Sequence, residues 1–205
     1  MDITSIGFIF SLAVLIVSVM IHEIAHGWTA FILGDPTAKL AGRLTLNPIK
    51  HIDPVGSIVV PLVLSLLPGG VVFGWAKPVP YNPYNLKVKN GPAYVALAGP
   101  ASNFIIAIIF SLLIRSGLGV SLLGIQALPI LSIIVLINIM LGLFNLIPIP
   151  PLDGSTILFS FFPPRSKFIE IFSRYQFVII LIIIFGAGFI IDKLLTTIFH
   201  LLTGL

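Results

Sequence analysis

Long stretches without charge divide this chain, and their lengths predict its helices. No Asp, Glu, Lys or Arg occurs at residues 90–114, 116–152 or 175–191. Each stretch can hold a helix that crosses a hydrocarbon core of about 30 Å, which takes about 20 residues. The N-terminal apolar stretch is as long, and Glu23 is its only formal charge. Together these stretches predict transmembrane helices at residues 3–33, 93–114, 122–147 and 175–203.

Residues 54–76 are also uncharged, but proline and glycine interrupt them. Pro61, Pro68, Gly69 and Gly70 leave pieces too short for a spanning helix. We therefore expect a re-entrant segment that could form a β-hairpin. The predicted fold class is an all-α polytopic membrane protein, with about four transmembrane helices plus this segment, in a single domain over residues 1–205.

The composition is typical of a protein of the lipid bilayer. Hydrophobic residues make up 58% of the chain and charged residues 9%, and the mean hydropathy is +1.16, which excludes an ordinary soluble domain. The net charge of +4 does not indicate nucleic acid, because nine of the eleven Lys and Arg lie in the loops at 34–53, 77–92 and 163–174. If residues 54–76 do not cross, these loops share one side, which we expect to be cytoplasmic. The opening stretch has no basic region before it, so we expect it to be retained in the protein.

One apolar stretch carries the motif His22-Glu23-Ile24-Ala25-His26. Ionisable side chains at membrane depth are costly, so they indicate a function. Helical spacing puts His22 and His26 one turn apart on one face, where two imidazole nitrogens can bind one tetrahedral Zn²⁺. Glu23 lies beside them, within reach of the water that such a metal activates. The motif therefore predicts a catalytic zinc site.

A hydrolytic zinc site needs a third protein ligand, and Asp153 is the best candidate. It follows a proline cluster that ends the predicted helix at 122–147 and frees backbone that must be buried or line a wet cavity. Asp153 could instead cap a short helix that begins at Gly154, and both roles can coexist. The chain has no cysteine, so thiolate ligands are excluded.

Three motifs in order resemble the site-2 protease family of intramembrane zinc metalloproteases. They are His22-Glu23-x-x-His26, then Gly99-Pro100-Ala101-Ser102-Asn103, then Asn145-x-x-Pro148-x-Pro150-x-x-Asp153-Gly154. The resemblance implies that His22, His26 and Asp153 ligate one zinc ion per chain and that Glu23 is the catalytic glutamate. It also implies that the substrate is a membrane-anchored protein cut within or near its transmembrane segment. The chain looks like a minimal form without PDZ-like or CBS-like domains, from a prokaryotic cell membrane.

Other polar residues in or near the predicted spans have two interpretations each. Asn103, Asn138 and Asn145 could bind the scissile carbonyl or its developing oxyanion, or they could form structural hydrogen bonds between helices. His51, just before the re-entrant segment, could serve a second metal or proton relay, but a role in shaping the loop or in supporting the site is the simpler reading.

The motifs favour a protease over two other classes of membrane protein. A zinc or cation transporter also places His, Glu and Asp in membranes, but it usually shows internal repeats, which this sequence lacks. A non-catalytic binder of membrane segments would not need Glu23. A helical substrate must unwind before hydrolysis, and the strand edge of residues 56–80 could receive it by β-augmentation. We expect water to reach the site from the cytoplasmic side.

Overall fold

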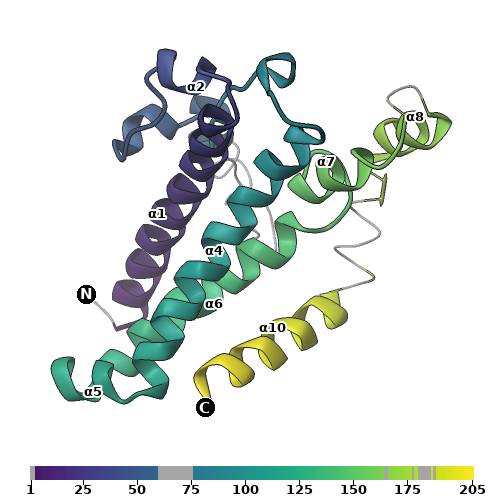
Figure 1. The fold of residues 1–205 in the computed structure, drawn as a ribbon. Coiled ribbons are helices and arrows are strands. Elements are labelled where there is room, and N and C mark those ends of the chain that lie inside the picture. Colours follow the sequence, from purple (N-terminus) through teal and green to yellow (C-terminus); the bar gives the residue numbers. More distant parts are fainter. Residues whose placement is uncertain (1–2, 60–75, 164–165, 177, 180–185, 187) are drawn as a thin grey trace.

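Three long helices run side by side in the computed structural model, which describes residues 3–59, 76–163, 166–176, 178–179, 186 and 188–205. They are α1 (Ile3–Ile32), α4 (Gly91–Arg115) and α6 (Ala127–Asn145) (Figure 1). All three are long and apolar enough to cross a membrane. The structure has helices over most of the spans expected at 3–33 and 93–114, and over 127–145 of the span expected at 122–147.

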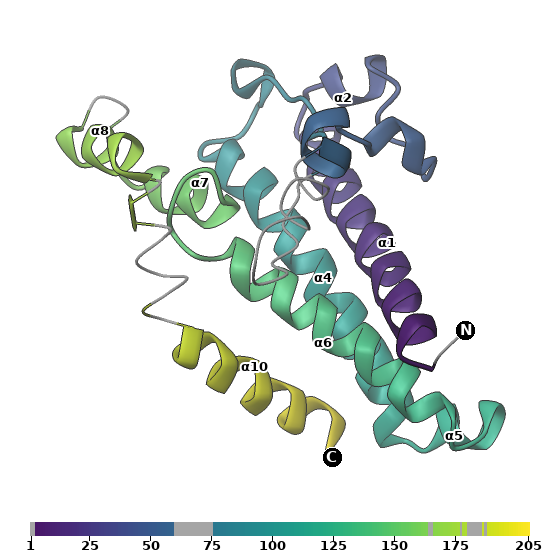
Figure 2. The same ribbon diagram turned by 180° about the vertical axis from the view of Figure 1, so that it is seen from behind.

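Short elements cover the two ends of this helical group. The short helices and turns are α2 (Thr37–Leu40), a 3₁₀ turn at Pro48–His51, a π turn at Pro54–Val59, a 3₁₀ turn at Pro83–Asn85, α5 (Leu118–Leu123), α7 (Asp153–Phe159) and α8 (Lys167–Arg174). The last helix is α10 (Gly188–Thr203). Figures 1 and 2 place α2, α7 and α8 at one end and α5 with the C-terminus at the other.

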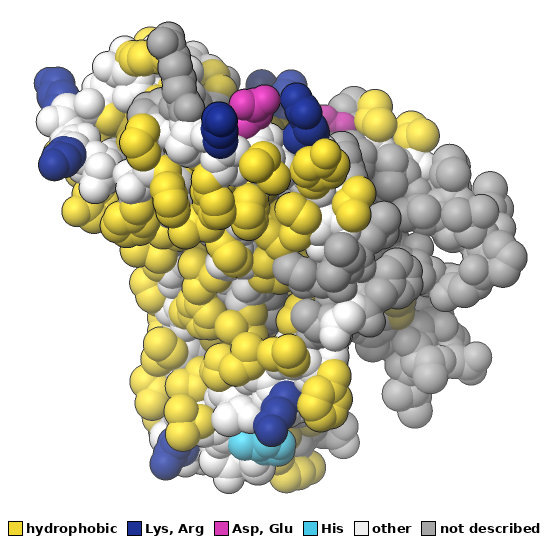
Figure 3. Space-filling model, turned by 90° about the vertical axis from the view of Figure 1, so that its right-hand side faces the viewer, with side chains coloured by type: hydrophobic (Ala, Val, Ile, Leu, Met, Phe, Trp, Pro, Cys, Tyr) yellow, Lys and Arg dark blue, Asp and Glu magenta, His cyan; other side chains and the backbone are white. Residues whose placement is uncertain are grey.

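Hydrophobic side chains form a band across the middle of one face of the molecule. In the space-filling view, Lys and Arg gather at the two ends and the band between them is apolar (Figure 3). This distribution is what a protein needs when its middle faces lipid and its ends face water. The protein is therefore an integral membrane protein.

The core lies between α4 and α6, in the half of the molecule away from α2. Its fully or nearly buried members are Ala107, Ile114, Ala127, Leu131, Val135 and Ile139. The small side chains of Ala107 and Ala127 leave room for α4 and α6 to approach closely. Helix α10 packs on this core through Leu195, Ile198 and neighbouring apolar residues. Arg115 at the end of α4 donates to the carbonyl of Leu201 at 3.0 Å, which fixes the end of α10.

Three expectations differ from the structure or lie partly beyond the described residues. The third span begins at Ala127 instead of residue 122, because Gly124 adopts a positive φ of 81° and separates α5 from α6. Of the span expected at 175–203, α10 is described, whereas 177, 180–185 and 187 lie outside the described residues. The expected re-entrant segment at 54–76 begins with a π turn instead of a strand. Residues 60–75, where a hairpin would form, also lie outside the described residues.

A segment without helix or strand at residues 77–82, here called the strap, crosses α1 near its C-terminal end. The buried carboxylate of Asp35 holds one end of the strap, because it accepts from the backbone N–H of Asn82 at 2.6 Å and from the amide of Asn85 at 2.8 Å. Burial alone would raise the pKa of Asp35, but the hydrogen bonds from Thr37, Asn85 and Asn82 outweigh it and hold that pKa below its ordinary value. Asp35 is therefore a charged anchor for the strap.

Candidate metal centre

His22 and His26 lie one turn apart on α1, on the side that faces α4. Their ring centroids are 4.6 Å apart and the rings are nearly perpendicular. The two Nε2 atoms approach to 3.0 Å. His22 is only 6% exposed, although it sits on a helix whose other face points outward. The pair therefore converges at one point inside the helical group.

Hydrogen bonds on the far side of each ring set which nitrogen carries the proton. Nδ1 of His22 lies 2.7 Å from Oδ1 of Asn103, and Nδ1 of His26 lies 2.6 Å from the carbonyl oxygen of Val95. Both oxygens can only accept, so this network assigns the proton to Nδ1 in each neutral ring. Each Nε2 then presents a bare lone pair, and two lone pairs 3.0 Å apart repel unless a cation lies between them.

Asp153 brings a carboxylate oxygen to the same point from the start of α7. Its Oδ2 lies 3.0 Å from Nε2 of His22 and 3.3 Å from Nε2 of His26. That oxygen is buried and has no hydrogen-bond partner. The alternative role as a helix cap is not observed, because α7 begins at Asp153 itself, Leu152 occupies the N-cap position, and no side chain caps the helix.

These three residues fit a tetrahedral metal ion. Metal–ligand distances of about 2.0–2.1 Å place neighbouring ligands of a tetrahedral zinc roughly 3.3–3.4 Å apart. The observed separations of 3.0–3.3 Å are close to that value. Within the described residues, His22, His26 and Asp153 form a group, here called the metal cluster, whose possible ligand atoms all lie within 4.8 Å of one another.

Two glycines make room for this arrangement. A Cβ added at Gly99 on α4 would lie 2.5 Å from the Nε2 atoms of both histidines, so α4 can pass the site only because residue 99 lacks a side chain. A Cβ at Gly154 would collide with the carbonyl oxygens of Leu146 and Ile147. The turn that presents Asp153 therefore packs directly on the backbone that leaves α6.

Glu23 makes a specific contact with the strap. Its Oε2 accepts the backbone N–H of Val79 at 2.8 Å. Two residues further on, burial and then the negative charge of Asp153 raise the pKa of the Tyr81 phenol. The strap thus passes close to both the glutamate of the motif and the third member of the metal cluster.

Asn103 and Asn138 belong to a buried network that joins α1, α4 and α6. Asn103 donates to Oδ1 of Asn138 at 3.0 Å and to the carbonyl of Ser18 at 3.4 Å. Asn138 donates to Oγ of Ser18 at 2.9 Å and to the carbonyl of Ile134 in its own helix at 2.9 Å. Both amides are fully buried. Their hydrogen bonds connect helices and orient His22.

Asn145 and His51 lie apart from this network. Asn145 is partly buried and donates to the carbonyl of Leu141 in its own helix at 3.0 Å. His51 is buried in the loop after α2, where its Nε2 contacts the carbonyl of Thr45 at 2.9 Å and its own carbonyl accepts from Lys77 at 2.9 Å. His51 therefore shapes the loop and is not a member of the metal cluster.

Sequence reasoning missed the residues that support Glu23. Neither Val79 nor Arg43 belongs to a motif that indicates a place beside Glu23. The available signal was the sequence Pro78-Val79-Pro80, in which a single N–H stands between two prolines. Nothing in the sequence places that N–H beside Glu23.

Comparisons with known proteins identify the family of this chain. The model of peptidase family M50 matches residues 120–184. The chain is 42% identical over 177 residues to "Putative zinc metalloprotease YwhC" of Bacillus subtilis (strain 168), a match that covers 82% of this chain and 77% of that protein. The chain belongs to peptidase family M50.

More distant relatives of this M50 chain are longer than the matched region. "Putative zinc metalloprotease Rip2" of Mycolicibacterium smegmatis is 32% identical over 164 residues, which cover 78% of this chain and 60% of that protein. "Zinc metalloprotease MJ0392" of Methanocaldococcus jannaschii is 29% identical over 144 residues, which cover 70% of this chain and 32% of that protein. No solved structure matches the chain significantly.

The family membership confirms the resemblance to site-2 proteases. The M50 chain is an intramembrane zinc protease, and the apolar helices agree with that assignment. The relatives are metalloproteases by name, so the comparisons do not favour a transporter. The family also implies zinc, membrane-protein substrates and a lipid bilayer as the surroundings.

Proposed function

We propose that His22, His26 and Asp153 hold one zinc ion per chain, and that Glu23 is the catalytic base of an HExxH-type endopeptidase. The observation that carries this proposal is the convergence of two bare Nε2 atoms and one unpartnered carboxylate oxygen within 3.0–3.3 Å. A bound zinc ion would supply Lewis acidity, which polarises a carbonyl and makes a water molecule acidic near neutral pH.

Glu23 would take the proton from the attacking water and deliver it to the leaving nitrogen. It lies on α1 next to His22 and one turn before His26, so its carboxylate is on the same side as the cluster. The contact between Oε2 and the Val79 N–H leaves the other carboxylate oxygen to carry the proton. With its proton on Nδ1, each ring would present Nε2 to the metal.

The substrate would be a membrane-anchored protein that is cut within or near its transmembrane segment. A helix hides its carbonyls in its own hydrogen bonds, so the segment must unwind before attack. The metal cluster lies near the end of α1 that carries α2 and the basic loops, and the positive-inside rule makes that end cytoplasmic. We therefore expect water to reach the site from the cytoplasmic side of a prokaryotic cell membrane.

Replacing Glu23 by Gln tests this function. The protein would be reconstituted in liposomes with a set of single-span reporter proteins, and cleavage and zinc content would be measured on the same samples. We expect cleavage to fall about 10²- to 10⁴-fold, because the general base is lost, while zinc remains bound.

The chain offers a matched control for this experiment. Its other glutamate, Glu170, is exposed on α8 and pairs with Arg174 at 3.4 Å. Glu170→Gln should cleave the reporters at the normal rate. If Glu23→Gln also cleaves them at the normal rate, the proposed role of Glu23 is wrong.

A further inference from the structure

The N–H that contacts Glu23 has a fixed place in the strap. Pro78 and Pro80 have no N–H, so Val79 carries the single backbone donor of residues 78–80. The Val79 side chain is 7% exposed and packs on Gly27, where an added Cβ would lie 2.7 Å from its Cγ1. Gly27 lies one turn after Glu23 on α1. Val79 is therefore seated on the same stretch of α1 that carries the motif.

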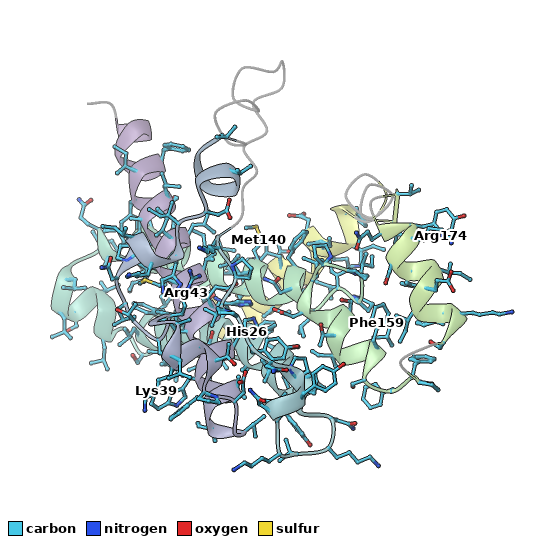
Figure 4. All side chains as sticks on the ribbon, turned by 90° about the horizontal axis from the view of Figure 1, so that it is seen from above. His26, Lys39, Arg43, Met140, Phe159 and Arg174 are labelled. Atoms are coloured by element: carbon cyan, nitrogen blue, oxygen red, sulfur yellow. The ribbon has the colours of Figure 1, made fainter. Side chains whose placement is uncertain are left out.

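Arg43 holds the same part of the strap from the opposite side. Its side chain is only 7% exposed. Its Nη2 donates to the carbonyl of Lys77 at 2.6 Å and to the carbonyl of Pro78 at 3.3 Å. Its backbone N–H is bonded to the carbonyl of Ala38 at 3.0 Å, so the residue that supplies the guanidinium is itself fixed at the end of α2. In Figure 4, seen from above, Arg43 and His26 lie on the same side of the structure, far from Arg174.

The carbonyl of Pro78 and the N–H of Val79 belong to one peptide unit. A peptide unit is planar, and in the trans form its C=O and N–H point in opposite directions. Within the described residues the Pro150–Pro151 bond is the one cis bond, so the Pro78–Val79 unit is trans. Arg43 therefore binds the carbonyl of this planar unit, and Glu23 binds its N–H.

We propose that Arg43 is a positioning residue for Glu23 and acts through the Pro78–Val79 peptide unit. By holding the Lys77 and Pro78 carbonyls, Arg43 fixes the direction of the Val79 N–H. That N–H then holds one carboxylate oxygen of Glu23 in place and leaves the other oxygen to face the metal cluster. A positive charge beyond the carbonyl also polarises the peptide unit and strengthens its N–H as a donor. This inference rests on the proposed catalytic role of Glu23.

The test separates this role from a purely structural one. Arg43→Gln and Val79→Pro would be assayed with the single-span reporters in liposomes, with kcat and KM determined separately and zinc content and thermal unfolding measured in parallel. Val79→Pro removes the N–H. Both variants should lower kcat about 10- to 100-fold, with KM and zinc content near normal, because a small displacement of a catalytic group has an effect of this size.

Three controls sharpen the result. Val79→Ala keeps the N–H and should lose much less than Val79→Pro. Arg43→Lys keeps a charged donor and should recover part of the rate lost in Arg43→Gln. Arg174→Gln removes an exposed arginine on α8 and should cleave normally. If Arg43 acts through the Val79 N–H, the double variant Arg43→Gln with Val79→Pro should be no slower than Val79→Pro alone.

Defined outcomes would overturn the inference. The inference is contradicted if the losses of kcat in Arg43→Gln and Val79→Pro are fully additive. It is also contradicted if these variants change only KM or zinc content, or if both keep a normal kcat. An inactive Glu23→Gln beside fully active Arg43→Gln and Val79→Pro would remove this inference and leave the proposed function standing. An active Glu23→Gln would remove both.

Discussion

Replacing Asn103 by Leu should weaken metal binding through His22. Asn103 contributes the oxygen that accepts the Nδ1 proton of His22 at 2.7 Å, and it is fully buried. Leu has a similar size but leaves that buried proton without an acceptor, at a cost of about 1–3 kcal/mol. Loss of such an outer partner typically weakens metal affinity about 10- to 100-fold, or about 1.4–2.8 kcal/mol. The two magnitudes agree, so we expect zinc affinity to fall within this range.

The assay would titrate the purified protein in detergent with a zinc chelator and follow thermal unfolding in parallel. Asn138→Leu is the matched control, because it removes the partner of the Asn103 amide but leaves the contact between Asn103 and His22. We expect Asn138→Leu to lower thermal stability with a much smaller change in zinc affinity. If Asn103→Leu binds zinc as tightly as the unmodified protein, or if both variants lose the same affinity, His22 does not depend on Asn103.

Two further substitutions test the space around the site and the anchor of the strap. Gly99→Ala should abolish zinc binding, measured by metal content, because the added Cβ would lie 2.5 Å from the Nε2 atoms of His22 and His26. The control Gly7→Ala, in open space on α1, should bind zinc normally. Normal zinc content in Gly99→Ala would refute this geometry. Asp35→Asn should lower thermal stability at neutral pH by on the order of 2 kcal/mol, because hydrogen bonds to a charged acceptor are lost. Since the folded pKa of Asp35 is lowered, its contribution is present above the unfolded pKa of about 3.9 and is lost as the pH falls through the folded pKa. A stability difference that does not narrow in acid would contradict this reasoning.

The parts of the site that depend on local geometry could be predicted from the sequence. His22 and His26 share a face because every α-helix repeats after 3.6 residues, whatever packs around it. The end of α6 was predictable for the same kind of reason, since the proline cluster after Asn145 cannot continue a helix. Asp153 could be proposed because it is the first carboxylate after that break.

The parts that depend on packing could not be predicted. Asn138 and Asn145 lie two turns apart on α6, yet Asn138 faces Asn103 whereas Asn145 bonds to its own helix. The sequence contains both amides but not the neighbour that each will meet. The contact between Glu23 and Val79 joins residues 56 positions apart, and no local pattern encodes such a pairing. The start of α6 was not predicted either, although its cause is local: the positive φ of Gly124 ends α5 and separates it from α6.

The distance along the chain between the ligands has a consequence for the protein's lifetime. His22 and Asp153 are separated by roughly 130 residues, so an ion shared between them would act as a cross-link that closes about two thirds of the chain into one loop. Binding that occurs only in the folded state adds its free energy to folding, and this contribution grows with the metal concentration. A cell short of zinc would then hold a looser protein, more exposed to quality-control degradation, in addition to losing the chemistry that the ion supplies.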